Sequence, residues 1–349
     1  MPSSQPKPRE ADRTLLFITM GTPSFIREDL DFMHETFRVR TFLYSPSRRI
    51  LPNVRQQMRL FAWLILNAPR ARTVIVWFAD YHAFLPVLFS RLSGGKSIVM
   101  LAGYDVTRIP KLNYGVFSNP IRSACARFAI GRADILAPVA RALAEKARLH
   151  VPIIRGRIVH VPFGFDASRW FCDTPKENLV LTVGFADDET RIRIKGLDFF
   201  VRAAERLPHV RFAVIGLGGE ARHRLKAPPN VRFFGRLPRA ELRKFYSRAK
   251  VYAQLSLSEG MPNVVCEAML CECVPVGTDA GGIPETIGDA GFILAGRDPE
   301  TAARTIRKAL AAPASAGRKA RQRVAEKFSE AGRREKMLSC ILSGPFIPS

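Results

Sequence analysis

The sequence lacks long apolar runs, and its cysteines do not follow the pattern of a small fold that is cross-linked by disulfides. No stretch of its 349 residues approaches the roughly 18 consecutive apolar residues of a membrane-spanning helix. The first apolar run, 15–20, is too short for the core of a secretory signal. No histidine stands at zinc-finger spacing from Cys266, Cys271 and Cys273. These absences predict a cytoplasmic protein with no metal site, or one that lies peripherally on the inner face of the cell membrane.

Acidic side chains are scarce as well. The chain has 54 lysines and arginines against 31 aspartates and glutamates, a net charge of +23. Residues 1–176 hold 26 basic and 12 acidic side chains, and the remainder holds 28 and 19. Because the excess forms no single tail, it favours a phosphate-bearing ligand together with an anionic membrane surface. A nucleic-acid partner and a simple compositional bias toward arginine stay open as alternatives.

Short apolar runs alternate with amphipathic segments along the whole chain, which is typical of βα units around parallel sheets. At about 150 residues per domain, the length favours two domains. Strands are expected at 14–19, 39–43, 73–78, 97–101, 135–137 and 158–161, and again at 179–183, 211–215, 231–234, 251–255, 274–277 and 291–294. Helices are expected at 25–37, 53–66, 81–92, 120–132 and 140–149, and the second half alternates in the same way. The pattern predicts two Rossmann-like domains in tandem.

The boundary between the domains is expected in a loop rich in proline, glycine and aspartate, at 161–178. We therefore predict domains at 1–168 and 169–328. The last segment, 329–349, has apolar residues too sparse for a full helix of either core. A tail that packs back across the first domain would explain it.

Three turns that contain glycine and proline, at 20–24, 258–263 and 280–285, directly follow expected strands. Ligands of open α/β sheets bind beyond the carboxyl ends of the strands, where such turns offer free N–H groups. Glu259 lies in the second turn, and Glu267 lies inside the apolar helix that follows it. A half-buried carboxylate needs donors, and the hydroxyls of a ribose or hexose would supply them. An internal salt bridge to an arginine is the alternative.

The stretch 231–294 resembles the second domain of glycosyltransferase family 4, retaining enzymes of the GT-B fold. Glu259 and Glu267 match the family's E-x7-E signature, and Gly281 and Gly282 match its paired-glycine turn. Upstream, Lys195 and the glycine after it match the family's Lys-Gly block. The resemblance covers most of 155–330, whereas in the first half only short segments are similar to bacterial and archaeal members.

Three positions depart from the family pattern. Phe185 replaces an arginine that usually follows the first Val-Gly, and Glu272 stands where a glycine is usual. No histidine lies near 102–103, so the family's acceptor-side chemistry is not carried over.

The resemblance implies two Rossmann-like domains that face each other across a cleft, with the C-terminal segment packing back on the first. It implies a retaining, metal-independent transfer of a sugar from a nucleoside diphosphate sugar to a lipid-linked or glycan acceptor. No cofactor is expected beyond that donor substrate, and no nucleic-acid partner. The alternatives are a sugar-nucleotide epimerase or a glycan phosphorylase of the same fold, and a basic nucleic-acid-binding protein.

The resemblance also assigns roles. Lys195, with Arg191 or Arg193, would neutralise the leaving diphosphate, while Glu259 would hold the donor sugar beside the N–H groups of Gly260 and Met261. Glu267 would hold the ribose. The expected catalytic residues are Lys195 and Glu259. The expected donor-binding residues are Gly21, Thr22, Gly184, Arg191, Arg193, Lys195, Gly216, Gly260, Met261, Glu267, Gly281 and Gly282.

The first domain supplies two candidates for acceptor contacts, His82 and Asp105. Its segment 48–72 interleaves arginines with Phe61 and Trp63, which indicates either a basic interfacial helix or an ordinary helix whose apolar face packs on the sheet.

Overall fold

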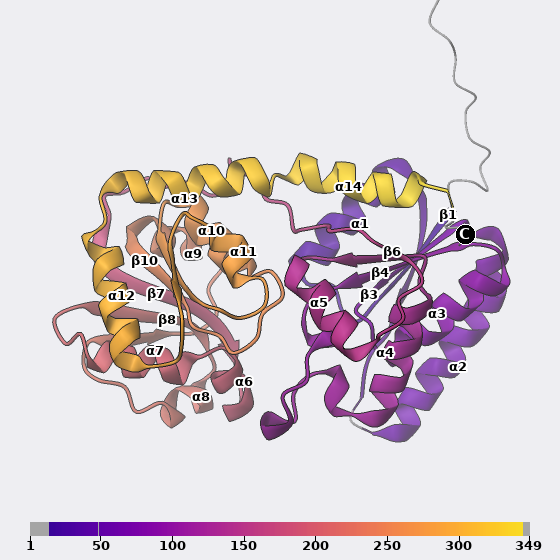
Figure 1. The fold of residues 1–349 in the computed structure, drawn as a ribbon, viewed down its shortest axis with the longest axis horizontal. Helices are drawn as coiled ribbons and strands as arrows, with labels where there is room; N and C mark the ends of the chain where they lie inside the picture. The colour runs from indigo at the N-terminus through magenta and orange to yellow at the C-terminus, as the bar shows by residue number, and fades with distance from the viewer. Residues whose placement is uncertain (1–13, 48, 345–349) are drawn as a thin grey trace, which may run out of the picture. The chain divides into compact units, whose positions relative to one another are not determined.

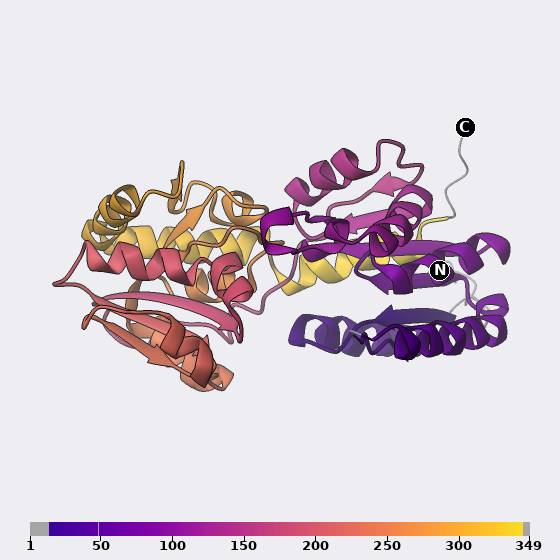
Figure 2. The same ribbon diagram turned by 90° about the horizontal axis from the view of Figure 1, so that it is seen from below.

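The computed structural model describes residues 14–47 and 49–344, and the chain divides into two compact units. Unit 1 comprises 1–161 together with 334–349, and unit 2 comprises 162–333. Each unit contains a six-stranded sheet with helices on both of its faces (Figures 1 and 2). The expected domain limits, 168/169 and 328/329, remain predictions; the limits of the compact units lie at 161/162 and 333/334.

The sheet of unit 1 is parallel throughout, with the strand order β2-β1-β3-β4-β5-β6. Its strands are β1 (Thr14–Thr19), β2 (Arg38–Leu43), β3 (Thr73–Trp77), β4 (Lys96–Leu101), β5 (Ile135–Pro138) and β6 (Arg157–Ile158). Its helices are α1 (Ser24–Thr36), α2 (Ile50–Asn67), α3 (Tyr81–Leu92), α4 (Pro120–Arg132) and α5 (Arg141–His150). The described residues of this unit also form the short 3-10 helices η2 (Ala68–Arg70), η3 (Tyr104–Val106), η4 (Pro110–Leu112) and η5 (Val116–Ser118).

Unit 2 has the strand order β12-β11-β10-β7-β8-β9, also parallel. Its strands are β7 (Glu177–Ala186), β8 (Arg211–Leu217), β9 (Val231–Phe234), β10 (Ala249–Gln254), β11 (Val274–Thr278) and β12 (Phe292–Leu294). Its helices are α6 (Glu189–Ile194), α7 (Leu197–Glu205), α8 (Gly219–Arg224), α9 (Arg239–Arg248), α10 (Asn263–Leu270), α11 (Ile283–Ile287), α12 (Pro299–Ala311) and α13 (Ala314–Lys327).

The expected fold class is confirmed, because every apolar run singled out in the sequence forms a strand. Buried parallel strands read as continuous apolar segments, and β1 and β3 are buried along their whole length. The ends differ by up to three residues, since β6 stops at Ile158 and β7 continues to Ala186. Val159 and Val161 nevertheless continue to donate hydrogen bonds to the carbonyls of β5.

The final segment forms a complete helix, α14 (Glu330–Leu342), whose part from Arg334 onward belongs to unit 1. Its few apolar residues suffice because Met337, Cys340 and Ile341 are all buried. Arg334 pairs with Glu35 at 3.0 Å and lies over the ring of Phe32. The expectation that the C-terminal segment packs back on the first unit is therefore confirmed.

Each sheet has one point where the strand order reverses. In unit 1, β3 joins β1 on the side opposite β2, and in unit 2, β10 joins β7 on the side opposite β8. Loops that leave the carboxyl ends of such strand pairs diverge, and the crevice between them is the usual ligand site of open α/β sheets. The ends of β1 and β3, and of β7 and β10, are therefore where a site is expected.

No helix in the described ranges, 14–47 and 49–344, is long and apolar enough to cross a bilayer.

Candidate functional site

The reversal point of unit 2 holds an ion pair. Lys195 directly follows α6, which starts just after β7, and Glu259 follows β10. The Lys195 Nζ lies 2.8 Å from the Glu259 Oε1. Their side chains are 32% and 11% exposed, so solvent reaches the pair from the lysine side. The loops after β7 and β10 thus bring together the two residues expected to be catalytic.

Backbone contacts explain why the two loops meet. Gly196 has φ of +66°, and a Cβ on it would lie 1.8 Å from the Leu255 carbonyl oxygen. Only glycine allows this approach. The N–H of Leu257 donates to the Ile194 carbonyl at 2.8 Å, so the residues on both sides of Lys195 are fixed to the strand end that carries Glu259.

Three donors converge on a single oxygen of Glu259. Besides Lys195, the Ser256 hydroxyl donates to Oε1 at 2.8 Å and the Gln254 amide donates at 3.1 Å. Gln254 and Ser256 are both buried. In turn, the Tyr252 hydroxyl donates to the Gln254 Oε1 at 2.9 Å, which fixes the orientation of the amide. The carboxylate is thereby held in one position, and its Oε2 has no hydrogen bond to the part of the chain that the structure describes.

The paired-glycine turn closes over the same loop. Gly281 has φ of +59°, and a Cβ there would lie 1.9 Å from the Glu259 carbonyl oxygen. The N–H of Gly282 donates to the Gly260 carbonyl at 2.8 Å. Lys195, Glu259, Gly260, Gly281 and Gly282 therefore form one structure, which we call the Lys195–Glu259 cluster.

Glu267 lies on α10, half-buried, and accepts a hydrogen bond from the Tyr246 hydroxyl at 3.4 Å. Burial, together with the negative charge of Glu267, raises the pKa of Tyr246, so this phenol stays protonated and able to donate. The neighbouring Met261 is buried, and its sulfur accepts from the Phe163 N–H.

The remaining expected residues of unit 2 lie at the ends of the neighbouring strands. Gly184 packs against the Leu197 side chain, which lies 3.1 Å from where a Cβ on the glycine would be. Gly216 has φ of +101°, and a Cβ on it would lie 2.9 Å from the Phe185 ring. Arg191 and Arg193 project from α6, and Arg193 pairs with Glu189 at 3.5 Å in an exposed position. The ion pair of Arg193 thus lies within its own helix and apart from the Lys195–Glu259 cluster.

Sequence reasoning missed four residues of this site. Gln254 and Ser256 fall at the end of an expected strand, and they are recognisable as functional only when their contact with Glu259 is known. Arg297 donates to the Leu255 carbonyl at 2.7 Å and so helps to fix the start of the loop after β10, which carries Glu259. Arg236 lies over the ring of Phe185 at 4.8 Å, beside the position where the family's arginine is replaced.

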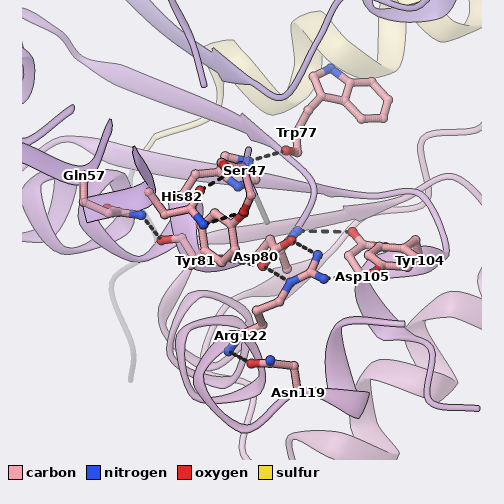
Figure 3. A network of polar contacts seen from close by, with 12 residues as sticks. Ser47, Gln57, Trp77, Asp80, Tyr81, His82, Tyr104, Asp105, Asn119 and Arg122 are labelled. Atoms are coloured by element: carbon pink, nitrogen blue, oxygen red, sulfur yellow. Dashed lines mark hydrogen bonds and ion pairs between the residues drawn. The ribbon is translucent and has the colours of Figure 1, made fainter. Parts of the chain in front are cut away.

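Unit 1 has a second polar cluster at its own reversal point, after β3 (Figure 3). Asp80 caps α3 by accepting from the Tyr81 N–H at 2.8 Å, and its fully buried carboxylate binds Arg122 through both oxygens. Arg122 also donates to the Tyr104 hydroxyl at 2.8 Å and lies against the rings of Tyr81 and Tyr104. Burial alone would lower the pKa of Arg122, but the bonds and charge of Asp80 raise it. The guanidinium is therefore permanently charged.

The two residues expected to contact an acceptor are both buried beside this cluster. The His82 Nε2 lies 2.8 Å from the Trp77 carbonyl oxygen and must carry the proton, and burial lowers the pKa of the ring. Asp105 accepts from the N–H groups of Ala79, Ala102 and Gly103. Burial raises the pKa of Asp105 to about 6, although these N–H groups oppose the shift. Both side chains shape the loops after β3 and β4, and their role toward an acceptor stays a prediction.

Gly21 and Thr22 lie in unit 1, after β1. Gly21 has φ of +83°, a Cβ built on it would meet no atom within 4 Å, and Thr22 is exposed. The structure thus leaves this turn accessible, at the reversal point of its own sheet.

Comparison with known proteins agrees with this geometry. Residues 177–312 match the family model described as glycosyl transferases group 1. TuaC of Bacillus subtilis, whose name assigns it to teichuronic acid biosynthesis as a glycosyltransferase, is 26% identical over 72% of this chain and 66% of its own length. A D-inositol 3-phosphate glycosyltransferase of Mycobacterium sp. is 32% identical over 44% of this chain and 37% of its own length.

The chain thus spans only 37% to 66% of the length of these relatives. Among solved structures, the Anabaena protein HepE in complex with UDP-glucose superposes with a TM-score of 0.71 and 15% identity over 93% of this chain and 98% of that one. The chain therefore has the GT-B fold, and its residues 177–312, which hold the Lys195–Glu259 cluster, match the model of the group 1 glycosyl transferases.

Proposed function

We propose that the protein transfers a glycosyl group from a nucleoside diphosphate sugar to a hydroxyl of a lipid-linked or glycan acceptor, with retention and without a metal ion. The observation that carries the proposal is the Lys195–Glu259 pair at the reversal point of unit 2, inside the region that matches the group 1 glycosyl transferases. HepE, with the same fold, was solved with UDP-glucose, which supports a nucleotide sugar as the donor class.

Lys195 and Glu259 divide the recognition of the donor between them. The ammonium of Lys195 neutralises the diphosphate, whose charge grows as the glycosidic bond breaks. The Oε2 of Glu259 accepts hydrogen bonds from the sugar hydroxyls, because Oε1 is already occupied by three protein donors. Glu267, half-buried on α10, accepts from the ribose diol.

The reaction needs no dedicated protein base in this scheme. The bond between the anomeric carbon and the diphosphate oxygen breaks, and the acceptor oxygen bonds to that carbon from the same face. The acceptor proton passes to the leaving diphosphate, whose oxygen is the base. This scheme is compatible with the buried, already hydrogen-bonded state of His82 and Asp105.

Phe185 leaves the site without the family's arginine, and Arg236 is proposed as a replacement beside Arg191 and Arg193. It lies over the Phe185 ring, at the carboxyl end of β9 next to the end of β8. Its guanidinium would add a second positive charge for the donor phosphates.

The acceptor is proposed to be presented at an anionic membrane face. Residues 1–176 carry the larger net positive charge, +14 against +9 for the remainder, so unit 1 is the part that such a surface attracts more strongly.

The proposal is tested by steady-state kinetics of Lys195→Ala with a panel of UDP-, GDP- and ADP-sugars. Loss of charge stabilisation predicts a fall in kcat of about 100-fold or more, with a smaller rise in donor KM. Lys244→Ala, which removes an exposed lysine paired with Glu241, is the control. Retained kcat with a raised KM would show that Lys195 only binds the ground state, and loss of all turnover with EDTA would refute metal independence.

A further inference from the structure

Three tyrosines and an arginine lie together on unit 1, beyond the carboxyl ends of β3 and β4. We call Tyr81, Tyr104, Tyr114 and Arg122 the tyrosine–arginine cluster. The Arg122 guanidinium carbon lies 5.6 Å from the centre of the Tyr81 ring and 5.1 Å from that of the Tyr104 ring (Figure 3). The Tyr104 and Tyr114 rings meet edge to face, with their centres 4.9 Å apart. All four residues are half-buried, so the cluster offers aromatic and polar surface at the end of the sheet where ligands of α/β folds bind.

Buried contacts hold the cluster in one arrangement. Asp80, which is fully buried, binds Arg122 through both carboxylate oxygens. The Asp105 carboxylate accepts backbone hydrogen bonds from the loop after β3 and from the loop after β4, and so joins the two loops. Two backbone hydrogen bonds between Ile109 and Tyr114 close the second loop further along. Side chains that are fixed in advance lose little entropy when they bind a ligand, so this arrangement suits a binding site.

The polar groups of the cluster have hydrogen-bonding capacity to spare. Within the described part of the chain, Arg122 uses three of its five side-chain N–H groups, two on Asp80 and one on the Tyr104 hydroxyl at 2.8 Å. Because the Tyr104 oxygen accepts this bond, its own proton remains to be donated to a ligand. The Tyr81 hydroxyl makes no hydrogen bond to any residue that the structure describes. The cluster can therefore offer several hydrogen bonds without breaking one of its own.

Charge and shape indicate the class of ligand. The negative charge of Asp80 balances the positive charge of Arg122, so the pair offers no net charge to an anion. The tyrosine rings present flat apolar faces, with hydroxyl and N–H groups around them. A pyranose ring is complementary to such a surface, because C–H groups cover its faces and hydroxyls surround its rim. An uncharged sugar therefore fits the cluster better than a phosphate or a carboxylate does.

We propose that the tyrosine–arginine cluster binds the ring of an uncharged sugar, and that this sugar is the end of the glycan that accepts the glycosyl group. The Tyr104 hydroxyl donates a hydrogen bond to one oxygen of the sugar, and the remaining N–H groups of Arg122 bind other oxygens. The rings of Tyr81 and Tyr114 contact its C–H groups. The role of the bound sugar as the acceptor rests on the proposed function, whereas the sugar site itself does not.

The test is saturation-transfer NMR of the whole chain, without donor, against two sets of methyl glycosides, each with monosaccharides and disaccharides. One set is uncharged, and the other carries a carboxylate or a phosphate at the primary carbon. Tyr104→Phe keeps the ring and removes the hydroxyl, whereas Tyr81→Ala removes a ring. Phe171→Ala is the control, because Phe171 is an exposed aromatic residue of unit 2 that lies 3.9 Å from the Arg243 guanidinium carbon.

At least one uncharged glycoside is expected to bind the wild type. Its dissociation constant should rise about 10-fold in Tyr104→Phe and about 10-fold or more in Tyr81→Ala, and should stay unchanged in Phe171→Ala. A purely structural role of Tyr104 would lower the stability of its variant without changing the affinity of the folded protein. Equal affinity in wild type and Tyr104→Phe, stronger binding of the charged set, or binding of no uncharged glycoside would overturn the inference. Donor-induced thermal shifts in the same variants report separately on the proposed function, because the donor is expected on unit 2.

Discussion

Single residues carry the departures from the family pattern, and Glu272 is the clearest. It has φ of +62°, in the left-handed region, and follows Cys271, the residue that caps the end of α10. The Cys273 N–H donates to the Ala268 carbonyl and the Glu272 N–H donates to the Met269 carbonyl, which is the Schellman arrangement that favours glycine. The glycine usual at this position is thus explained by backbone conformation, and this chain adopts the same turn with a strained glutamate.

Replacement of Glu272 by glycine should therefore stabilise the protein. A side chain in the left-handed region costs about 1 to 2 kcal/mol, of which the greater freedom of glycine in the unfolded chain cancels a part. We expect the free energy of unfolding to rise by about 1 kcal/mol, measured by urea denaturation. Glu335→Gly, in the exposed middle of α14, should lower it by a similar amount. A destabilised Glu272→Gly would contradict the strain argument.

Asp105 makes stability depend on pH. Its folded pKa of about 6 is above the ordinary value, so between those values the folded chain binds more protons than the unfolded chain. Its contribution to stability is full at low pH and is lost as the pH rises through about 6. Asp105→Asn does not titrate. We therefore compare the free energy of unfolding of the wild type with that of the variant. The difference, wild type minus variant, should fall by roughly 3 kcal/mol from about pH 4 to about pH 7. If urea denaturation gives the same pH dependence of stability for the wild type and for Asp105→Asn, the raised pKa of Asp105 is excluded.

At the scale of elements, α14 depends on one buried lysine. The Lys96 Nζ, at the start of β4, donates to the carbonyls of Cys340 and Ile341 at 2.6 and 2.7 Å and also to that of Ser343. A cation at a helix C-terminus satisfies carbonyls that the helix leaves unpaired and interacts favourably with its dipole. Lys96 is thus the anchor of the last helix on unit 1.

Lys96→Met should release the end of α14. It leaves buried carbonyls without a donor, at a cost of about 1 to 3 kcal/mol. Hydrogen exchange should become faster in 334–342 than in the rest of unit 1. Lys336→Met makes the same chemical change on the exposed side of α14 and should leave exchange unaltered. Unchanged exchange in Lys96→Met would mean that the apolar contacts alone hold the helix.

At the scale of the whole molecule, the donor is expected to bind unit 2. A ligand at 100 times its dissociation constant stabilises the folded state by about 2.7 kcal/mol, so the accepted nucleoside diphosphate sugar should slow hydrogen exchange in 162–333. Glu267→Ala should remove this protection, because the ribose diol loses its acceptor. Protection confined to unit 1, or retained in a folded Glu267→Ala, would contradict the assignment.

The sequence by itself determined the alternation of strands and helices, because buried parallel strands must be apolar along their whole length. It also predicted Lys195, Glu259 and the paired glycines as residues of one site, because the motifs that contain them have a recognisable spacing. For Glu272, the sequence showed only that a glutamate replaces the usual glycine, and it did not show that the backbone there is left-handed.

Only the tertiary structure decided which side chains meet. Lys195 and Glu259 are far apart in the chain, and the ion pair arises because the strand order reverses between β7 and β10. The structure also showed that Leu60 and Leu64 of α2 are buried while Met58 and Ile65 of the same helix are exposed, because burial depends on which face of the helix packs on the sheet. Likewise, His82 and Asp105 are buried through contacts with distant segments, such as Tyr44 against His82 and Ala79 with Asp105, which composition and spacing do not encode.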